Sequence, residues 1–406
     1  MRTPNLLLKP SAYKANKLYS ILPSDGGGDF TVSSYIGNGT RVNSEGLIET
    51  VASDTPRIDY LGGAGLLLEP TRTNLMTYST GTSGASWSGG SAIQTANDEM
   101  APDGSKTAVK LEDTSLVAQH AQTKQVTISA TTQYTFSIFI KFGNNTGDKV
   151  NVNIDLQAGT TASTTNFLYS DGTWTINTDA TGIIDDTGSE YYGNGWWRFY
   201  ATFTSLTGNT SVLFTMYPSY GNFDLEPRGY FWYWGNQLEA GAFMTSLIPT
   251  TTGAVERLYD FFPGVDLMAA GLLSYSTGFI VIKAQDLENR IADLTNSLFY
   301  IGTTNGIVKL FYASLTEQYP SIRVQSTDAT NSTYTLTKTS ANIGINVTWD
   351  NIDIWVDGIK VLTTSKEFYF TDTSAEIIGI GASWKLKELA IYNREVTDTE
   401  AKALTS

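Results

Sequence analysis

Residues 125–143, "QVTISATTQYTFSIFIKFG", alternate apolar and polar side chains over their second half. Tyr134, Phe136, Ile138 and Ile140 are two residues apart, so they share one face of an extended strand, because successive side chains of a strand point to opposite faces. The same spacing recurs in "KVNVNIDLQAG" (149–159). No helical periodicity persists around either run. The stretch therefore predicts a half-buried strand within an all-β fold.

The composition agrees with this prediction. Glycine (37 residues) and aromatic residues (12%) are plentiful in a chain of 406 residues, and β-branched and aromatic side chains suit a pleated surface. A chain of this length is expected to form two or three domains rather than one core. There is no cysteine, which excludes disulfides, thiolate metal sites and a thiol nucleophile.

Three segments are predicted from the distribution of strands and turns. Residues 71–262 carry many strand candidates and are expected to form a β-sandwich of jelly-roll type. Residues 263–406 are expected to form a second sandwich, with a hairpin over 346–365 and a tight turn at Asp357-Gly358. A short helix over 397–406 is expected to close the chain, with Thr397 or Asp398 as its N-cap.

Residues 1–70 are predicted to form a small, extended, β-rich module ahead of the two sandwiches. Its short apolar strands, such as "NLLL" (5–8) and "GLLL" (65–68), are too few to build an independent core. Strand edges need partners for their N–H and C=O groups. We therefore expect these strands to pair with other subunits or another protein; the alternative is that they pack on the first sandwich within one chain.

Several classes of partner are excluded by the charge and the hydropathy. The formal net charge is −14 and no Lys/Arg cluster is present, which argues against nucleic acid. No segment reaches the roughly 18 apolar residues of a membrane helix, so membrane insertion is not expected. A secretory signal needs an apolar core of roughly 7–15 residues, and "MRTPNLLLKP" (1–10) is interrupted too early to be one.

Four separated phrases carry a resemblance to a known family. "TRVNSEGLIE" (40–49), "PRIDY" (56–60), "GLLLEPTRTNL" (65–75) and "WGNQLEAGAFMTSLIPTTTGAVER" (234–257) resemble, in this order, phrases of tailed-phage tail-fibre or head-fibre proteins. In those proteins the last two phrases open and close a jelly roll that is similar to carbohydrate-binding modules. "VTWDNIDIWVDGIKV" (347–361) and "GASWKLKELAIYNREVTDTEAKAL" (381–404) resemble laminin-G-like or concanavalin-like sandwiches.

The resemblance implies a virion structural protein, assembled in the host cytoplasm, that displays lectin-like sandwiches for attachment to host-surface glycans. Residues 1–70 would bind other virion proteins, of the capsid or the tail, and the chain would form a homo-oligomer, most simply a trimer. Two alternatives stay open: a polysaccharide-degrading enzyme with a binding module, and a structural spacer that binds no glycan.

Candidate glycan-binding residues are aromatic, because the apolar face of a pyranose stacks on an aromatic ring. The candidates carried forward are Trp87, Tyr192, Trp196 and Trp232. Adjacent aromatics such as Trp196 and Trp197 face opposite sides of a strand, so one of each such pair points outward. The alternative interpretation is that these side chains belong to the core or cover a neighbouring loop.

Metal binding and catalysis have weaker signals. Asp185, Asp186 and Glu190 are expected on one loop, where they would offer oxygen atoms to a calcium ion, although their spacing matches no known cation loop and solvated charges are the alternative. The single histidine, His120, lacks partners for a metal site. No nucleophile-elbow or phosphate-binding motif is present, so we expect no enzymatic activity and no cofactor.

One structural contact is predicted at the boundary of the first sandwich. Arg72 opens the sandwich, and Glu239 and Glu256 lie in the phrase that closes it. The first and last strands of a jelly roll often lie close together. We therefore expect Arg72 to form a partly buried ion pair with Glu239 or Glu256.

Overall fold

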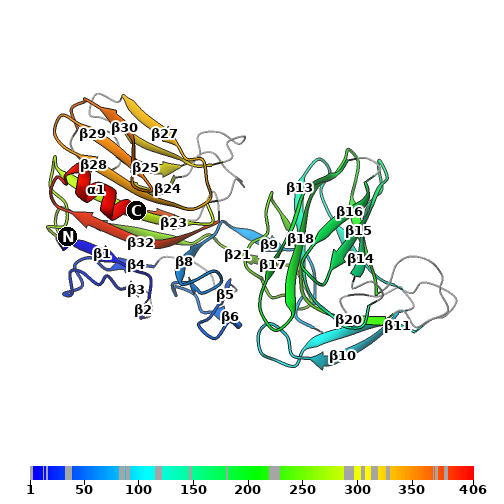
Figure 1. Ribbon diagram of the computed structural model, residues 1–406. Helices are drawn as coiled ribbons and strands as arrows, with labels where there is room; N and C mark the ends of the chain where they lie inside the picture. The colour runs from blue at the N-terminus through cyan, green and yellow to red at the C-terminus, as the bar shows by residue number, and fades with distance from the viewer. Residues whose placement is uncertain are drawn as a thin grey trace.

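The computed structural model describes residues 3–11, 13–14, 17–32, 39–81, 87, 92–114, 121–145, 149–179, 182–218, 229–287, 297–302, 307–311, 319–325, 330–368, 370, 374–378 and 383–406. In these ranges the chain is nearly all β and builds two sandwiches that lie side by side (Figure 1). The predicted all-β class is therefore confirmed.

The first sandwich packs a six-stranded sheet on a five-stranded sheet. The alternating face predicted from the sequence lies in its core, where Phe136 stacks on Phe214 of the other sheet with ring centroids 4.3 Å apart. In order, the six strands are β10 (Ile93–Glu99), β11 (Ala108–Asp113), β20 (Gly229–Ala240), β13 (Gln133–Phe142), β18 (Trp196–Thr204) and β17 (Ile184–Tyr191). The five are β12 (Gln122–Thr127), β19 (Ser211–Tyr217), β14 (Lys149–Gln157), β15 (Ala162–Tyr169) and β16 (Trp174–Asp179).

The second sandwich packs an eight-stranded sheet on a six-stranded sheet around a separate core. The larger sheet runs β30 (Ile359–Thr364), β29 (Ile352–Val356), β28 (Ala341–Val347), β23 (Gly278–Gln285), β32 (Trp384–Tyr392), β8 (Gly65–Leu68) and β7 (Ile58–Asp59), with β1 (Leu6–Leu8) also on β32. The smaller runs β22 (Phe261–Asp266), β31 (Ser374–Ile378), β24 (Ser297–Ile301), β25 (Ile307–Phe311), β26 (Ser321–Gln325) and β27 (Asn331–Thr335).

Three N-terminal strands belong to this second sandwich, which corrects the expectation that they need partners outside the chain. β8 pairs with residues 384–386 of β32 and β1 pairs with residues 389–391, so the two short strands share one edge of β32. Leu6, Leu8, Leu66 and Leu68 are fully buried in the second core. The edge that satisfies these strands lies in the same chain, more than 300 residues away in the sequence.

Another part of the N-terminal segment covers the first sandwich. The hairpin of β5 (Gly39–Val42) and β6 (Ile48–Val51) places Val42 and Ile48 in one apolar cluster with Trp196 and Trp234 from the six-stranded sheet. Two further small sheets are β2 (Tyr13–Lys14), β3 (Lys17–Leu18) and β4 (Phe30–Thr31), and β9 (Arg72–Asn74) with β21 (Val255–Arg257). Residues 1–70 thus contact both sandwiches, as Figure 1 shows.

The local predictions at the C-terminal end are confirmed. β29 and β30 pair across Asp357-Gly358, and both turn residues have positive φ (46° and 77°), as a tight hairpin turn requires. The helix α1 (Asp398–Thr405) begins after Thr397, whose side chain accepts a hydrogen bond from the Glu400 N–H while the Glu400 side chain accepts one from the Thr397 N–H. This capping box selects Thr397 over Asp398 as the N-cap.

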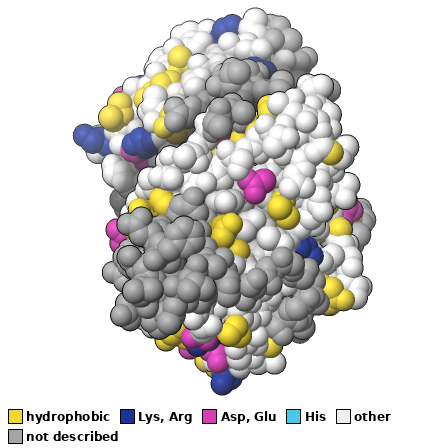
Figure 2. Space-filling model, turned by 90° about the vertical axis from the view of Figure 1, so that its right-hand side faces the viewer, with side chains coloured by type: hydrophobic (Ala, Val, Ile, Leu, Met, Phe, Trp, Pro, Cys, Tyr) yellow, Lys and Arg dark blue, Asp and Glu magenta, His cyan; other side chains and the backbone are white. Residues whose placement is uncertain are grey.

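The outer surface of the first sandwich carries few charged side chains. Figure 2 shows the face turned away from the second sandwich, on which hydrophobic side chains are scattered and do not form a continuous patch among the coloured residues. This agrees with the low share of charged residues, 16% of the chain. Within the described ranges α1 is the one helix, and it is not long and apolar enough to cross a membrane.

Candidate functional site

A buried ion cluster joins the two sandwiches, and Glu69 is at its centre. We define this cluster as Arg57, Glu69, Arg257 and Asp260, all of them buried. Glu69 Oε2 accepts hydrogen bonds from Arg57 Nη1 and from Arg257 Nη1, both at 2.6 Å. Asp260 pairs with the other side of the Arg57 guanidinium and accepts from the Glu69 N–H at 2.8 Å. Two arginines therefore balance two carboxylates at the join.

The environment of Glu69 holds it in the ionised form. Burial alone opposes ionisation, but Arg257, Arg57 and two hydrogen bonds from Ser246 outweigh it and lower the pKa of Glu69 to about 2. Ser246 donates from its N–H at 2.6 Å and from its hydroxyl at 2.7 Å. Ser246 comes from the closing phrase 234–257, so the cluster links the start and the end of the first sandwich to the second.

The phrase that follows Glu69 continues this join. Asn74 donates from its amide to Ile248 O at 2.9 Å and accepts from the Leu238 N–H at 3.1 Å, so it connects the opening and closing phrases of the first sandwich. Arg72 Nε lies 3.8 Å from Glu239 Oε2, and its guanidinium lies over the Phe243 ring at 4.8 Å from the ring centroid. Glu256, the other predicted partner of Arg72, is exposed on β21.

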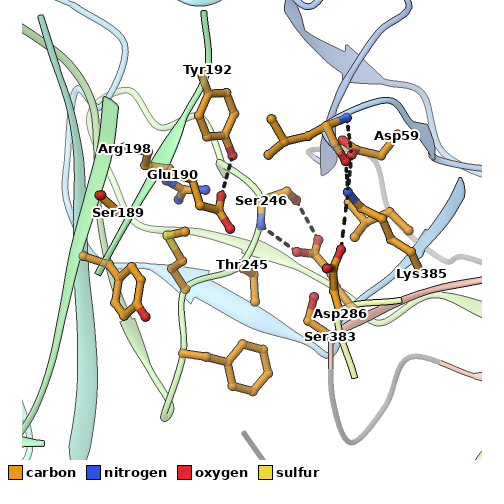
Figure 3. Close-up of a pocket in the computed structure, with 16 residues that line it drawn as sticks. Asp59, Ser189, Glu190, Tyr192, Arg198, Thr245, Ser246, Asp286, Ser383 and Lys385 are labelled. Carbon is orange, nitrogen blue, oxygen red and sulfur yellow. Dashed lines mark hydrogen bonds and ion pairs between the residues drawn. The ribbon is translucent and has the colours of Figure 1, made fainter. Parts of the chain in front are cut away.

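A cleft of about 210 Å³ opens beside the buried ion cluster, between the two sandwiches. One wall comes from β17 and β18 of the first sandwich, and the opposite wall comes from the N-terminal strands and the second sandwich (Figure 3). Residues 243–246 line the cleft between the walls. Its polar and apolar lining residues are Asp59, Leu61, Leu67, Glu69, Ser189, Glu190, Tyr192, Arg198, Tyr200, Phe243, Met244, Thr245, Ser246, Asp286, Ser383 and Lys385.

Several charged groups of the cleft are fully engaged within the protein. Lys385 Nζ lies 2.8 Å from Asp59 Oδ1 and donates to Leu61 O at 2.6 Å. Asp59 also accepts from the N–H groups of Val42 and Leu61, at 2.7 and 3.0 Å. Together with Glu69, these groups hold the walls in place and have little capacity left for a ligand.

Glu190, Arg198 and Asp286 are less completely engaged. Glu190 accepts from the Tyr192 hydroxyl at 3.3 Å, and Asp286 Oδ2 lies 3.6 Å from Lys385 Nζ. Arg198 is only 2% exposed; its Nη2 donates to Ser137 Oγ at 3.0 Å, whereas its Nε has no hydrogen-bond partner among the described residues. Figure 3 shows Glu190 and Arg198 beside each other, across the cleft from Asp286.

The cleft changes the acidity of two of its side chains. The Glu190 side chain reaches solvent, yet the walls remove much of its hydration, and this desolvation raises its pKa against the opposing effect of Arg198 and Lys385. Burial and the neighbouring Glu190 also raise the pKa of Tyr192, which therefore remains a hydrogen-bond donor at neutral pH.

The predicted aromatic residues lie at different depths. Trp87 is fully buried in the first core, 6.2 Å from Tyr233 between ring centroids. Trp196 points outward from its sheet but is only 2% exposed, because the β5–β6 hairpin covers it. Trp232 and Tyr192 are partly buried at the rim of the same apolar cluster, and Tyr192 also lines the cleft. All four aromatics therefore pack against other parts of the chain, and among them Tyr192 also lines this cleft.

The three predicted calcium ligands do not converge. Asp185, Asp186 and Glu190 lie along strand β17 rather than on a loop, which corrects that expectation. Asp185 Oδ2 accepts from Gln133 at 2.8 Å and from Thr204 at 2.7 Å. Among the described residues no group of three or more Asp, Glu or His side chains is placed to hold a metal ion. His120 lies outside the described residues.

Sequence reasoning missed the buried ion cluster and the second wall of the cleft. Arg57 lies in "PRIDY" (56–60) and Glu69 in "GLLLEPTRTNL" (65–75), and each is a charged residue flanked by apolar or proline residues. That flanking was the available signal, because a charged side chain within a buried run needs a partner. Asp286 and Lys385 had no comparable local signal.

Comparisons with known proteins add little to this geometry. No family model matches the sequence, and no curated protein does. Among solved structures, a CBM40 of a Ruminococcus gnavus IT-sialidase bound to α2,3-sialyllactose is 15% identical, with a TM-score of 0.26 over 36% of this chain and 94% of that one. Domain 4 of AbnA, a GH43 extracellular arabinanase from Geobacillus stearothermophilus in complex with arabinotriose, is 13% identical, with a TM-score of 0.27 over 41% and 81%.

A Trypanosoma rangeli sialidase in complex with the inhibitor DANA is 11% identical, with a TM-score of 0.25 over 74% of this chain and 60% of that one. Scores this low carry no argument about ligand or activity. Both therefore rest on the residues of this chain.

Proposed function

We propose that the chain is a structural protein of a phage virion that binds host-surface glycans in the cleft between its two sandwiches and has no enzymatic activity. Support for a virion protein comes from the order of the four phrases within 40–257 and their resemblance to fibre proteins of tailed phages. The phrases that open and close the first sandwich meet at the buried ion cluster and at Asn74. The resemblance of these two phrases to fibre proteins therefore falls on residues that form one structural joint.

The observation that carries glycan binding is the composition of the cleft. Its lining combines hydroxyl, carboxylate and guanidinium groups with the apolar side chains of Phe243 and Met244. Sugars bind to such surfaces because their hydroxyls need donors and acceptors while their C–H faces need apolar contact. A volume of about 210 Å³ limits the occupant to a small group such as the end of a glycan chain.

The same cleft gives the enzyme alternative its specific observation. Glu190, with its raised pKa, stands across the cleft from Asp286, and hydrolysis of glycosides uses one protonated and one ionised carboxyl group. We favour binding because Asp286 already lies near Lys385. A reducing-sugar assay on capsular and cell-wall polysaccharides separates the two: measurable release that disappears in Glu190→Gln would establish the enzyme.

We further propose that residues 1–70 attach the chain to the particle and that the chain assembles as a homotrimer. Because β1, β7 and β8 are paired within the chain, contact with other virion proteins falls to exposed side chains of this segment. Tyr19 and Ile21 are such side chains, 36% and 47% exposed. Mutating both to serine is expected to lower incorporation into particles without changing the fold.

Two measurements test the proposal as a whole. A glycan array probed with the full-length protein is expected to show binding, and absence of binding to host-type glycans would favour the spacer alternative. Mass spectrometry of purified virions, followed by antibody labelling in electron micrographs, is expected to find the chain on the capsid or the tail. Purified particles that lack the chain would refute the virion role.

A further inference from the structure

The groups of the cleft that retain hydrogen-bonding capacity lie on both of its walls. Glu190 has one hydrogen bond from Tyr192, at 3.3 Å, and both carboxylate oxygens can accept more. Arg198 is buried, and a guanidinium has five N–H donors, whereas its hydrogen bonds go to Ser137 and Tyr192 and its Nε has no partner among the described residues. Asp286 faces them from the second sandwich. A ligand that uses all three must offer both donors and an acceptor.

The charge balance of the cleft is negative. Its lining holds four carboxylates and two cationic groups, Arg198 and Lys385. Glu69 is neutralised from outside by Arg57 and Arg257, and Lys385 is already paired with Asp59. What remains is the neighbouring pair of Glu190 and Arg198, together with Asp286, which shares Lys385 with Asp59 at a distance of 3.6 Å, so that these three groups carry one net negative charge. A second negative charge brought into this space would meet repulsion in a partly desolvated site.

We infer that the cleft recognises the neutral hexopyranose end of a glycan and discriminates against uronic acids and other anionic sugars. This inference rests on the proposed glycan-binding function. Two neighbouring hydroxyls of the sugar donate to Glu190 and accept from Arg198, and a third donates to Asp286. Met244, which is partly exposed in the cleft, supplies apolar contact for the C–H face of the ring. The groups come from both sandwiches, so the joint between them forms the site.

Other ligand classes fit the same groups less well. An anionic sugar whose carboxylate accepts from Arg198 would stand beside Glu190, the cross-strand neighbour of Arg198, and the other cation of the lining, Lys385, is held by Asp59 and by Leu61 O. The raised pKa of Glu190 agrees with a site that already disfavours negative charge. A purely apolar ligand would displace water from Glu190, Arg198 and Asp286 without offering hydrogen bonds in its place, which costs binding free energy.

The test is isothermal titration calorimetry with the full-length protein. The probes are trisaccharides of glucose, galactose and mannose, each with a counterpart whose terminal sugar is the uronic acid. Glu190→Gln and Asp286→Asn keep the side-chain volume and remove one charge each; Asp286 has a positive φ of 60°, which asparagine tolerates. The matched control is Asp185→Asn, an exposed acid on the same strand as Glu190 and outside the cleft.

We expect at least one neutral trisaccharide to bind at least tenfold more tightly than its uronic counterpart. Loss of a charged hydrogen-bond acceptor is expected to weaken that binding about tenfold in each cleft variant, and the Asp185→Asn control is expected to match the wild type. Circular dichroism confirms that the variants are folded.

Three results would overturn the inference in distinguishable ways. Tighter binding of a uronic trisaccharide would refute the charge argument. Binding of neutral sugars that Glu190→Gln and Asp286→Asn both leave unchanged would place the sugar elsewhere and leave the proposed function standing. No binding of any sugar, here and on the glycan array, would remove the proposed function itself.

Discussion

Removing the charge at the centre of the buried ion cluster should lower the free energy of unfolding substantially. In Glu69→Gln the side chain keeps its size but loses its charge, so Arg57 retains Asp260 whereas Arg257 loses its carboxylate partner. The pKa of Glu69 falls from its ordinary value of 4.5 to about 2 in the folded protein. At about 1.4 kcal/mol per pKa unit, this shift corresponds to roughly 3 kcal/mol of stabilisation by the ionised form. Breaking a buried ion pair has a cost of the same order.

Urea unfolding at pH 7, followed by tryptophan fluorescence, measures this loss. Glu69→Gln is expected to lower the free energy of unfolding by about 3 kcal/mol. The matched control is Glu256→Gln, which removes an exposed carboxylate beside Arg257 and is expected to change stability by less than about 0.5 kcal/mol. If Glu69→Gln is as stable as the Glu256→Gln control, the cluster does not hold the sandwiches together as argued.

The pH dependence provides an independent check. The folded-state pKa of Glu69 lies below its unfolded value, so the stabilisation is complete above about pH 4.5 and is lost as the pH falls through about 2. The difference between the wild type and Glu69→Gln should therefore be constant between pH 7 and pH 5 and should shrink below pH 4.5. A difference that grows on acidification would contradict this assignment.

Three further perturbations test other joints of the fold. Thr397→Ala removes the capping box of α1 and should cost about 1 kcal/mol in urea unfolding. Gly81→Ala should destabilise strongly, because Gly81 has a φ of 89° and an added Cβ would overlap the carbonyl oxygen of Thr107, whereas Gly253→Ala, with open space around it, should be neutral. Deleting residues 1–10 removes β1 and exposes half of one β32 edge, so light scattering should detect aggregation; a monodisperse, equally stable product would show that β1 is dispensable.

The sandwich class could be predicted because its signal is local. Tyr134, Phe136, Ile138 and Ile140 share one face of β13, and that face lies in the first core as predicted. The opposite face is buried too, with Phe139 in the cluster under the β5–β6 hairpin, so the strand is buried on both faces rather than on one. The turn at Asp357-Gly358 and the capping box at Thr397 were equally readable, because each depends on residues within four positions of one another. Features that depend on contacts between residues close together in the chain can therefore be predicted from the sequence.

The partners of the N-terminal strands could not be predicted in the same way. The apolar residues Leu6 and Leu66 indicate buried strands, but nothing local specifies that both pair with β32. β32 is the last strand of the chain, and its edge is available because β23 occupies only the other side. Pairing over such a separation depends on the whole fold, and this is why the local sequence predicts strands without partners in the same chain.

The cleft could not be predicted from the sequence for a related reason: its two walls come from different sandwiches. Glu190 and Arg198 are cross-strand neighbours on β17 and β18, whereas Asp286 and Lys385 belong to the second sandwich. The local sequence favours aromatic residues as candidates, and most of these side chains are covered in the structure. A large apolar ring that points out of a sheet is itself a surface on which another segment packs. The β5–β6 hairpin uses Trp196 and Trp234 in this way.

The position of the buried ion cluster next to the cleft has a consequence for binding. Glu69 lines the cleft and also holds Arg57, Arg257 and Ser246 together, so the cluster fixes the two walls relative to each other. A site whose walls are held in place before the ligand arrives loses less conformational entropy on binding than one that must close. Glu69→Gln should therefore weaken sugar binding although Glu69 has its hydrogen bonds within the protein, and it should do so with a more unfavourable binding entropy. An enthalpic loss alone would instead indicate that Glu69 contacts the sugar directly.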